Sequence, residues 1–240
     1  MVQLPEQTKS EVLLRTLMLV VRDHGSAAFS SSLSAEDMVV TDTLLSSSLD
    51  IEIFTIDTGR LHADTIELLD DIRRRYNYDV RVYTPDGGAV SNHVAQYGPY
   101  AFYADPELRR ECCRIRKVEP LKRALSGKNA WITGLRRDSA ASRASVPLQE
   151  YDSNYALLKF NPIAEWSDQD VWDYLRAHAV PYNRLYDQGY RSIGCAPCTR
   201  PSIPGEDPRA GRWWWEQIGA KECGLHVAAN GRLVRAGEIA

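Results

Sequence analysis

The five cysteines are the residues whose type and spacing are best suited to chemistry. Two are adjacent, in "RRECCRIRK" at 109–117, and two are three positions apart, in "GCAPCTRP" at 194–201. The fifth is Cys223, in "KECGLH". Reduced cysteines bind metals or act as nucleophiles, whereas oxidised ones form disulfides. How these five group together therefore indicates which chemistry the chain performs.

Cys195 and Cys198 form a C-x-x-C pair, which suits either a redox dithiol or one side of a metal site. A redox pair normally opens a helix after the first strand of a thioredoxin-like fold. This pair instead stands late in the chain, in a segment rich in Gly and Pro. A four-thiolate site needs two more ligands, and Cys112 and Cys113 can supply them. The spacing therefore favours a metal site that uses both pairs.

Zinc and an iron–sulfur cluster are the alternatives for such a site. Structural zinc sites typically use two C-x2–4-C pairs, and adjacent thiolates fit one tetrahedral ion poorly because they diverge. The irons of a cubane are separate, so neighbouring cysteines can reach different irons, and four-cysteine ligation is typical of 4Fe–4S clusters. Arg114, Arg116 and Lys117 follow directly and suit an anionic cluster. A disulfide between Cys112 and Cys113, or two buried thiols without a function, are the other interpretations.

Cys223 is left over from this grouping. Lys221 and His226 lie near it in sequence, and a nearby cation lowers the pKa of a thiol and so favours the nucleophilic thiolate. An isolated cysteine near a C-terminus is also often inert. Both interpretations stay open on these residues alone.

Composition argues against several other classes of protein. The chain has 240 residues, of which 44% are hydrophobic and 25% charged, and a formal net charge of −3. That balance is ordinary for a soluble globular protein and gives no reason to expect nucleic-acid binding. No apolar run approaches the roughly 20 residues of a membrane span, and the N-terminus lacks a secretory signal. We therefore expect a cytoplasmic protein with reduced thiols and no membrane or nucleic-acid partner.

The elements that must position the cysteines alternate between strands and helices. Apolar strands are predicted over 27–30, 49–59, 78–85 and 129–135, with a further strand and turn over 155–166. Helical periodicity is found over 10–25, from 35 onward, and over 62–77, 106–127 and 167–180. This alternation is typical of βαβ units, so we predict an α/β fold with a parallel twisted sheet and flanking helices. Residues after 181 give no regular pattern.

Three loops leave the predicted strands with similar side chains. They are "SSSLSAED" (30–37), "DTGRLH" (57–62) and "GLRRDSAASR" (134–143), all rich in hydroxyls, carboxylates or arginines. Ligands of an open parallel sheet bind beyond the carboxyl ends of its strands. We therefore expect the three loops to form one polar cleft that accepts an anion.

Four motifs carry a family resemblance. "ECCRIRK", "GCAPCTRP", "RAGRWWWE" and "KECGLH", in this order and spacing, resemble the assimilatory adenylyl-sulfate (APS) reductases. These form the iron–sulfur branch of the phosphoadenylyl-sulfate/adenylyl-sulfate reductase family. The resemblance runs from about Ala27 to His226. It implies an adenine nucleotide α-hydrolase-like fold, with a nucleotide-binding domain over 1–205. The remaining segment, 206–240, would carry the catalytic cysteine. Its last 20 or so residues, around Cys223, look like a loosely tethered tail.

The resemblance also implies roles for individual residues. Cys112, Cys113, Cys195 and Cys198 would bind a 4Fe–4S cluster. Cys223 is similar to the family's nucleophile. The other implied catalytic residues are His226 and Lys117, the latter linking the cluster region to the substrate site. Substrate-binding residues implied in the same way are Ser31, Ser32, Asp57, Thr58, Gly59, Arg143, Arg209 and Arg212.

The phosphate-binding loop departs from the family pattern. The family has Ser-Ser-Phe-Gly-Ala-Glu-Asp, whereas this chain has Leu33 and Ser34 in place of Phe and Gly. Glycine permits a positive φ and a close approach of backbone to phosphate. We therefore expect Ser34 to be the substitution that matters for substrate binding.

The implied reaction is the thiol-dependent reduction of adenylyl sulfate to sulfite and AMP in assimilatory sulfate reduction. Cys223 would form an S-sulfocysteine that thioredoxin or glutaredoxin resolves. The sequence defines no oligomeric state and is compatible with a homo-oligomer.

Three other functions are weighed against this one. A phosphoadenylyl-sulfate (PAPS) reductase differs only in accommodating a 3′-phosphate, and relatives with that preference often lack both cysteine pairs. An ATP-pyrophosphatase-type enzyme would need a Ser-Gly-Gly-x-Asp-Ser loop, which is missing here. A non-catalytic iron–sulfur sensor that binds nucleic acid would need a basic face and no Cys223.

Overall fold

A six-stranded sheet forms the centre of the molecule. The computed structural model describes residues 7–216. The strand order is β3-β2-β1-β4-β6-β5. All neighbours pair in parallel except β5 and β6, which are antiparallel. The strands are β1 (Ala27–Ser30), β2 (Glu52–Ile56), β3 (Arg81–Tyr83), β4 (Ala130–Thr133), β5 (Gln149–Asp152) and β6 (Leu157–Phe160).

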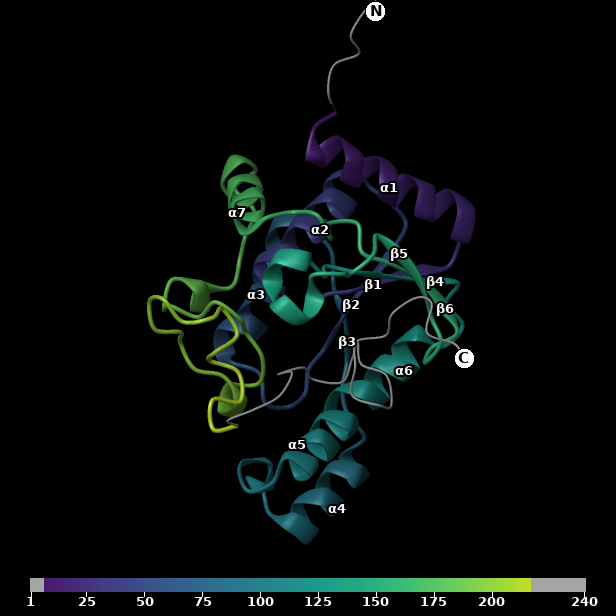
Figure 1. The fold of residues 1–240 in the computed structure, drawn as a ribbon. Coiled ribbons are helices and arrows are strands. Elements are labelled where there is room, and N and C mark those ends of the chain that lie inside the picture. The colour runs from purple at the N-terminus through teal and green to yellow at the C-terminus, as the bar shows by residue number, and fades with distance from the viewer. Residues whose placement is uncertain (1–6, 217–240) are drawn as a thin grey trace, which may run out of the picture.

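Helices cover both faces of this sheet (Figure 1). They are α1 (Lys9–His24), α2 (Ala35–Ser46), α3 (Ala63–Tyr76), α4 (Gly87–Tyr97), α5 (Pro106–Cys113), α6 (Glu119–Leu125) and α7 (Asp168–Ala177). The larger apolar core lies between one face and α1, α2, α3 and α7, and the smaller one lies under α6. The middle strand, β1, carries Phe29 in the first core and Ala28 in the second, each fully buried. The sequence prediction of an α/β fold with a parallel sheet is confirmed.

Three features of the fold differ from the prediction or were absent from it. The edge strand β5 runs antiparallel, and α4 had no predicted counterpart. The helical run around the cysteines is continuous, because α5 passes into a π-helix (Arg114–Val118) before α6 begins. Such π segments are rare and occur frequently at functional sites.

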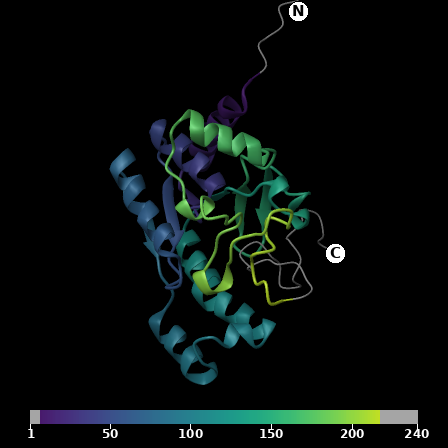
Figure 2. The same ribbon diagram turned by 90° about the vertical axis from the view of Figure 1, so that its left-hand side faces the viewer.

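The segment after α7 has little regular structure, as predicted. Figure 2 shows it, green to yellow, as loops with short helical turns. Two 3₁₀ turns interrupt it, at Arg184–Tyr186 and Ala196–Cys198. Backbone contacts hold it to the sheet side of the molecule, since the Ala196 N–H donates to Arg60 O at 2.7 Å. No helix in the described part of the chain is long and apolar enough to cross a membrane.

Candidate active site and adjoining cysteine pocket

The three polar loops meet in one cavity of about 620 Å³ beyond the carboxyl ends of β1, β2 and β4. β1 lies at the switch point of the sheet. The chain passes from β1 to β2 and β3 on one side of β1, and then crosses to β4 on its other side. Ligands of open α/β sheets bind at such a point. The expected convergence of the loops is confirmed, and the volume suits a small-molecule ligand.

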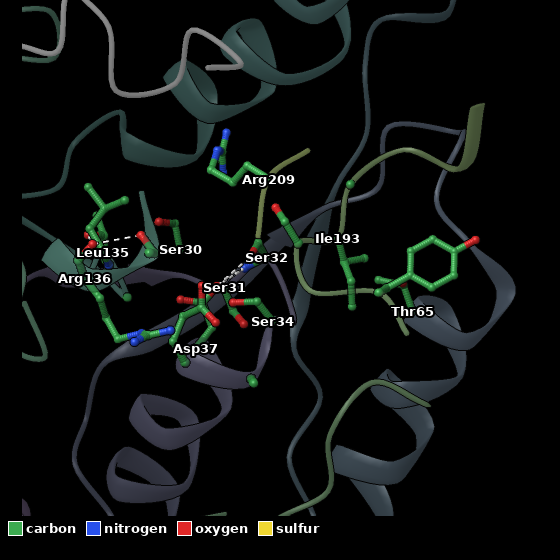
Figure 3. Close-up of a pocket in the computed structure, with 18 of the residues that line it drawn as sticks. Ser30, Ser31, Ser32, Ser34, Asp37, Thr65, Leu135, Arg136, Ile193 and Arg209 are labelled. Atoms are coloured by element: carbon green, nitrogen blue, oxygen red, sulfur yellow. Dashed lines mark hydrogen bonds between the residues drawn. The ribbon is translucent and has the colours of Figure 1, made fainter. Parts of the chain in front are cut away.

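The first loop and the start of α2 form a polar pocket floor (Figure 3). Ser31 is buried, and its Oγ accepts from the Leu33 N–H at 3.2 Å. The Ser32 N–H and Oγ both donate to Asp37 Oδ2, at 2.7 and 2.6 Å. The N-terminus of α2 and its loop amides make a local environment that favours an anion.

Ser34 does not require the backbone freedom of glycine. It is the N-cap of α2 with φ −79°, and the positive φ of the loop falls on buried Leu33, at 61°. The reason for expecting glycine at position 34 therefore does not apply to this backbone.

Asp37 is the buried carboxyl of the loop. Burial, followed by the neighbouring Glu36 carboxylate, raises the pKa of Asp37 to about 7, and hydrogen bonds from Ser32 and Ser34 partly oppose the shift. Gly134, after β4, leaves room for this carboxyl: a Cβ there would lie 1.9 Å from Asp37 Oδ1. A carboxyl that titrates near neutrality thus adjoins the candidate phosphate-binding amides.

Arginines surround the cavity from two sides. Arg143 and Arg209 line it, as does Arg212 from the "RAGRWWWE" segment. Arg143 is 9% exposed and donates to Ser139 Oγ at 3.4 Å. Figure 3 shows Arg209 on the far side of the space from Asp37. The structure thus brings all three sequence-predicted arginines to one cavity.

Sequence reasoning missed Arg136 as an individual residue. It also lines the cavity, is 5% exposed, and is held by Trp166 O and Asp168 Oδ1, each at 3.2 Å. The only signal was its place in an arginine-rich loop after a strand. Aromatic residues that line the cavity, and that no motif indicated, are Phe54, Trp131, Trp172, Tyr186 and Tyr190.

The "DTG" residues divide between two places. Thr58 is buried and lines the cavity, but its Oγ1 also lies 3.2 Å from Cys195 Sγ. Asp57 accepts a hydrogen bond from the Gly59 N–H at 2.8 Å and so closes a turn. As the described residues define the cavity, Asp57 and Gly59 lie beside it rather than in its lining.

All four paired cysteines line a second, smaller pocket. Cys112 and Cys113 come from the end of α5, and Cys195 and Cys198 from the late 3₁₀ turn. Adjacent residues on a helix point about 100° apart, so the first two thiols enter the pocket in different directions. Within residues 7–216, no three His, Cys, Asp or Glu side chains are arranged to bind a single metal ion. The donor set fits a multi-iron cluster better than one zinc ion.

Cations surround the four thiols. Lining residues include Arg60, Arg109, Arg116 and Lys117. Burial, followed by the neighbouring Cys195 and Cys113, raises the pKa of Cys198 to about 12, and Lys117 and Arg212 partly oppose the shift. Coordination by a metal deprotonates a thiol outright, and the arginines and lysine would offset the resulting negative charge. The residues present therefore fit a 4Fe–4S cluster.

Two details of this pocket differ from the sequence expectation. Arg114 is exposed and pairs with Glu111, with both hydrogen bonds at 2.7 Å. Arg116 is buried, and its Nη1 donates to Thr58 O at 2.6 Å. The inward cations thus come from Arg116 and Lys117, together with Arg60 and Arg109, which the sequence analysis did not single out.

Lys117 lines both pockets. It lies on the π-helix (Arg114–Val118) that follows the tandem cysteines. Cys223 and His226, together with the expected loosely tethered tail, lie outside the described residues.

An open, mostly parallel sheet with a hydroxyl-rich loop at its switch point defines an adenine nucleotide α-hydrolase-like protein. Solved structures agree on the fold. A phosphoadenylyl-sulfate reductase from Candida auris, in a phosphate complex, aligns with a TM-score of 0.67 and 26% identity over 81% of this chain and 91% of that one. An FMN adenylyltransferase from Candida glabrata shares the fold at TM-score 0.53 and 12% identity, over 91% and 81% of the two chains.

Sequence comparison gives the family. The model of the phosphoadenosine phosphosulfate reductase domain matches residues 26–201. An adenosine 5′-phosphosulfate reductase of Neisseria meningitidis serogroup A is 52% identical, covering 91% of this chain and 90% of the relative. One from Allochromatium vinosum is 49% identical over 91% and 86%. The chain belongs to the phosphoadenosine phosphosulfate reductase family, among its adenosine 5′-phosphosulfate reductases.

Proposed function

We propose that this chain reduces adenylyl sulfate to sulfite and AMP in sulfate assimilation. One observation carries the proposal: an anion-binding cavity at the switch point adjoins a pocket of four cysteines, and Lys117 lines both. The adenosine 5′-phosphosulfate reductases at about half identity over nine-tenths of the chain support the same substrate.

The cavity supplies distinct groups for the two halves of the substrate. Aromatic and apolar side chains suit the adenine ring, whereas Ser31, Ser32 and the α2 amides suit the phosphate. Arg143, Arg209 and Arg212 would hold the phosphosulfate and offset the charge that develops on the departing AMP phosphate. Thr58 would contact the nucleotide from β2, and Asp57 and Gly59 would shape that turn.

Cys223 is the proposed nucleophile. Its thiolate attacks the sulfate sulfur, the bond from sulfur to the phosphate oxygen breaks, and AMP departs with that electron pair. The product is an S-sulfocysteine. His226, three residues later, would stabilise the thiolate or the sulfate. Lys117 would offset the charge of the sulfo group. The segment 206–240 would act as the unit that carries the nucleophile.

A dithiol protein completes the turnover. Its first thiolate attacks Cys223 Sγ, and sulfite leaves with the electron pair of the sulfur–sulfur bond. Its second thiol then resolves the mixed disulfide, which restores the Cys223 thiol and leaves the partner oxidised. Thioredoxin or glutaredoxin is the proposed reductant. This chemistry needs reduced thiols, so the cytoplasm is the proposed compartment. A homo-oligomer is compatible with it.

A 4Fe–4S cluster is the proposed cofactor. Cys112, Cys113, Cys195 and Cys198 would hold it. Bound there, it would contribute charge and local rigidity, since the two electrons of the reduction come from thiols. Arg116 and Lys117 would orient toward the ligand sulfurs and keep the pocket electrically balanced.

A PAPS reductase is the second candidate. The matching family description and the Candida auris structure both name that substrate. The two substrates differ by a 3′-phosphate, so a direct comparison of turnover separates them.

The test is sulfite release from anaerobically purified protein with thioredoxin, comparing adenylyl sulfate with its 3′-phosphorylated form. Iron and acid-labile sulfide are assayed on the same sample. Sulfite from adenylyl sulfate with about four irons per chain is the expected result. Cys223→Ser should keep the iron and lose sulfite production. Preference for the 3′-phosphorylated form would favour the second candidate, and an intact cluster without turnover of either would favour a sensor.

A further inference from the structure

An ion pair joins α5 to the end of the "RAGRWWWE" segment. Arg109, on α5, makes a two-point contact with Glu216 through Nε to Oε1 and through Nη2 to Oε2, the second at 3.1 Å. The side chains are only 5% and 13% exposed. Two-point arginine–carboxylate pairs fix orientation as well as position. Glu216 is therefore held in one place relative to α5.

Trp213 strengthens the same junction. Two guanidinium groups lie over its ring, those of Arg109 and Arg212, at 4.5 and 4.8 Å from the ring centroid. The backbone N–H of Trp213 donates to Cys198 O at 3.1 Å, and the backbone N–H of Glu216 donates to Trp213 O at 2.9 Å. Cation–π contacts gain strength when they are desolvated, and Trp213 is 1% exposed.

The junction contacts both pockets. Arg109 lines the cysteine pocket together with Cys113. Arg212 lines the substrate cavity, and its Nη1 donates to Ile193 O at 2.9 Å. The junction therefore lies between the cysteine pocket, which Arg109 and Trp213 line, and the substrate cavity, which Arg212 lines.

We propose that Arg109, Trp213 and Glu216 are positioning residues. They hold the start of the segment that carries Cys223, at Glu216, against the cysteine pocket. This inference rests on the proposed role of Cys223, which follows Glu216 by seven residues. Seven residues span at most about 25 Å. A fixed start keeps Cys223 within this reach of the cysteine pocket and so raises its effective concentration at the substrate. None of the three side chains takes part in bond making.

The test uses Glu216→Gln, which keeps the shape of the side chain and removes its charge. Glu206→Gln is the matched control, because Glu206 makes a similar two-point pair with Arg200, at 3.0 Å for each contact, ten residues earlier in the same segment. Formation of the S-sulfocysteine is followed by mass spectrometry in a single turnover without reductant. We expect a roughly tenfold to hundredfold slower rate for Glu216→Gln, with iron content and KM kept.

Glu216→Asp retains a carboxylate and should recover part of the rate. Parent-like adduct formation by Glu216→Gln would overturn the proposal, as would equal slowing by Glu206→Gln. A second readout is independent of activity: hydrogen exchange of the Trp213 and Glu216 amides should accelerate in Glu216→Gln and stay unchanged in the control. Unchanged hydrogen exchange in Glu216→Gln would show that the ion pair with Arg109 does not hold this part of the chain, and would overturn the proposal. A parent protein that forms no adduct would instead contradict the proposed function.

Discussion

The substrate cavity and the cysteine pocket are built in different ways, although they share Lys117. The cavity is made by loops at the ends of β1, β2 and β4, so the sheet itself brings its residues together. The cysteine pocket is formed instead by helical segments, where the junction of α5 with the π-helix meets the late 3₁₀ turn. Substitutions in the cavity should therefore change substrate binding, and substitutions in the cysteine pocket should change iron content. Only a residue that lines both should change the two together.

The largest effect is expected inside the cysteine pocket. Cys198 is one of the four proposed cluster ligands and is only 8% exposed. Cys198→Ser removes its thiol. We expect loss of bound iron and, with it, loss of sulfite production, because a buried three-thiolate site does not complete a cubane. Iron, acid-labile sulfide and visible absorption check the outcome. Arg143→Ala, in the cavity, should raise KM and keep the iron. Iron retention by Cys198→Ser would contradict the four-ligand assignment.

Lys117 is the residue where the two regions should fail together. Lys117→Met keeps the length of the side chain and removes its charge. We expect kcat to fall by about a hundredfold, the scale of losing one preorganised charge partner, together with a shifted visible spectrum of the cluster.

Lys122→Met is the matched control for this variant, since Lys122 is exposed five positions later, on α6. It should change neither readout. A parent-like visible spectrum in Lys117→Met would contradict the proposal that Lys117 acts on both the cluster and the substrate site.

The same difference explains what could be predicted from the sequence. Strand ends are visible in a sequence, because buried apolar runs stop at polar residues, so the three loops and their common cavity were predictable. The grouping of the four cysteines followed from their chemistry. Arg109 and Arg136 carry no such signal. Each is a buried cation defined only by its three-dimensional partners, Glu216 and Asp168.

Local backbone conformation was the least predictable feature. The family pattern places glycine at position 34, yet the left-handed residue is Leu33. The π-helix is equally hidden, because its residues continue an ordinary helical pattern. β5 was missed because an edge strand that alternates exposed and buried residues over only four positions gives little periodicity.

The close approach of Gly134 to Asp37 gives a test confined to the cavity. A Cβ at position 134 would lie 1.9 Å from Asp37 Oδ1 and 3.4 Å from its Cα, so Gly134→Ala must displace helix α2 or the carboxyl. We expect a stability loss of about 2 kcal/mol and weaker substrate binding, with iron content unchanged. Urea unfolding and iron assays measure both.

Gly87→Ala is the control for backbone entropy. A Cβ there would have nothing within 4 Å among the described residues, and Gly87 opens α4. It should be neutral or stabilising by up to about 1 kcal/mol. An equal loss in the two variants would show that crowding against Asp37 is not the cause.

The smallest effect is a pH dependence that only the cavity should show. The pKa of Asp37 rises from 3.8 to about 7 on folding. Stability gained from the neutral carboxyl is therefore complete below about pH 4 and is lost as pH rises toward 7. The groups that face Asp37 include Glu36 on α2, Tyr186 on the 3₁₀ turn after α7, and Arg136 after β4.

The ionised carboxylate also competes with phosphate for the Ser32 N–H. Binding of adenylyl sulfate should therefore weaken above pH 7, by up to about tenfold per pH unit if only the neutral form admits the ligand. Measuring the dissociation constant in a Cys223→Ser background separates this effect from titration of the nucleophile. Asp37→Asn should flatten the profile, and Glu36→Gln should move its midpoint to lower pH, because Glu36 raises the pKa of Asp37. A parent-like profile in Asp37→Asn would assign the dependence to another group, whereas flattening with unchanged iron content would confine it to the cavity.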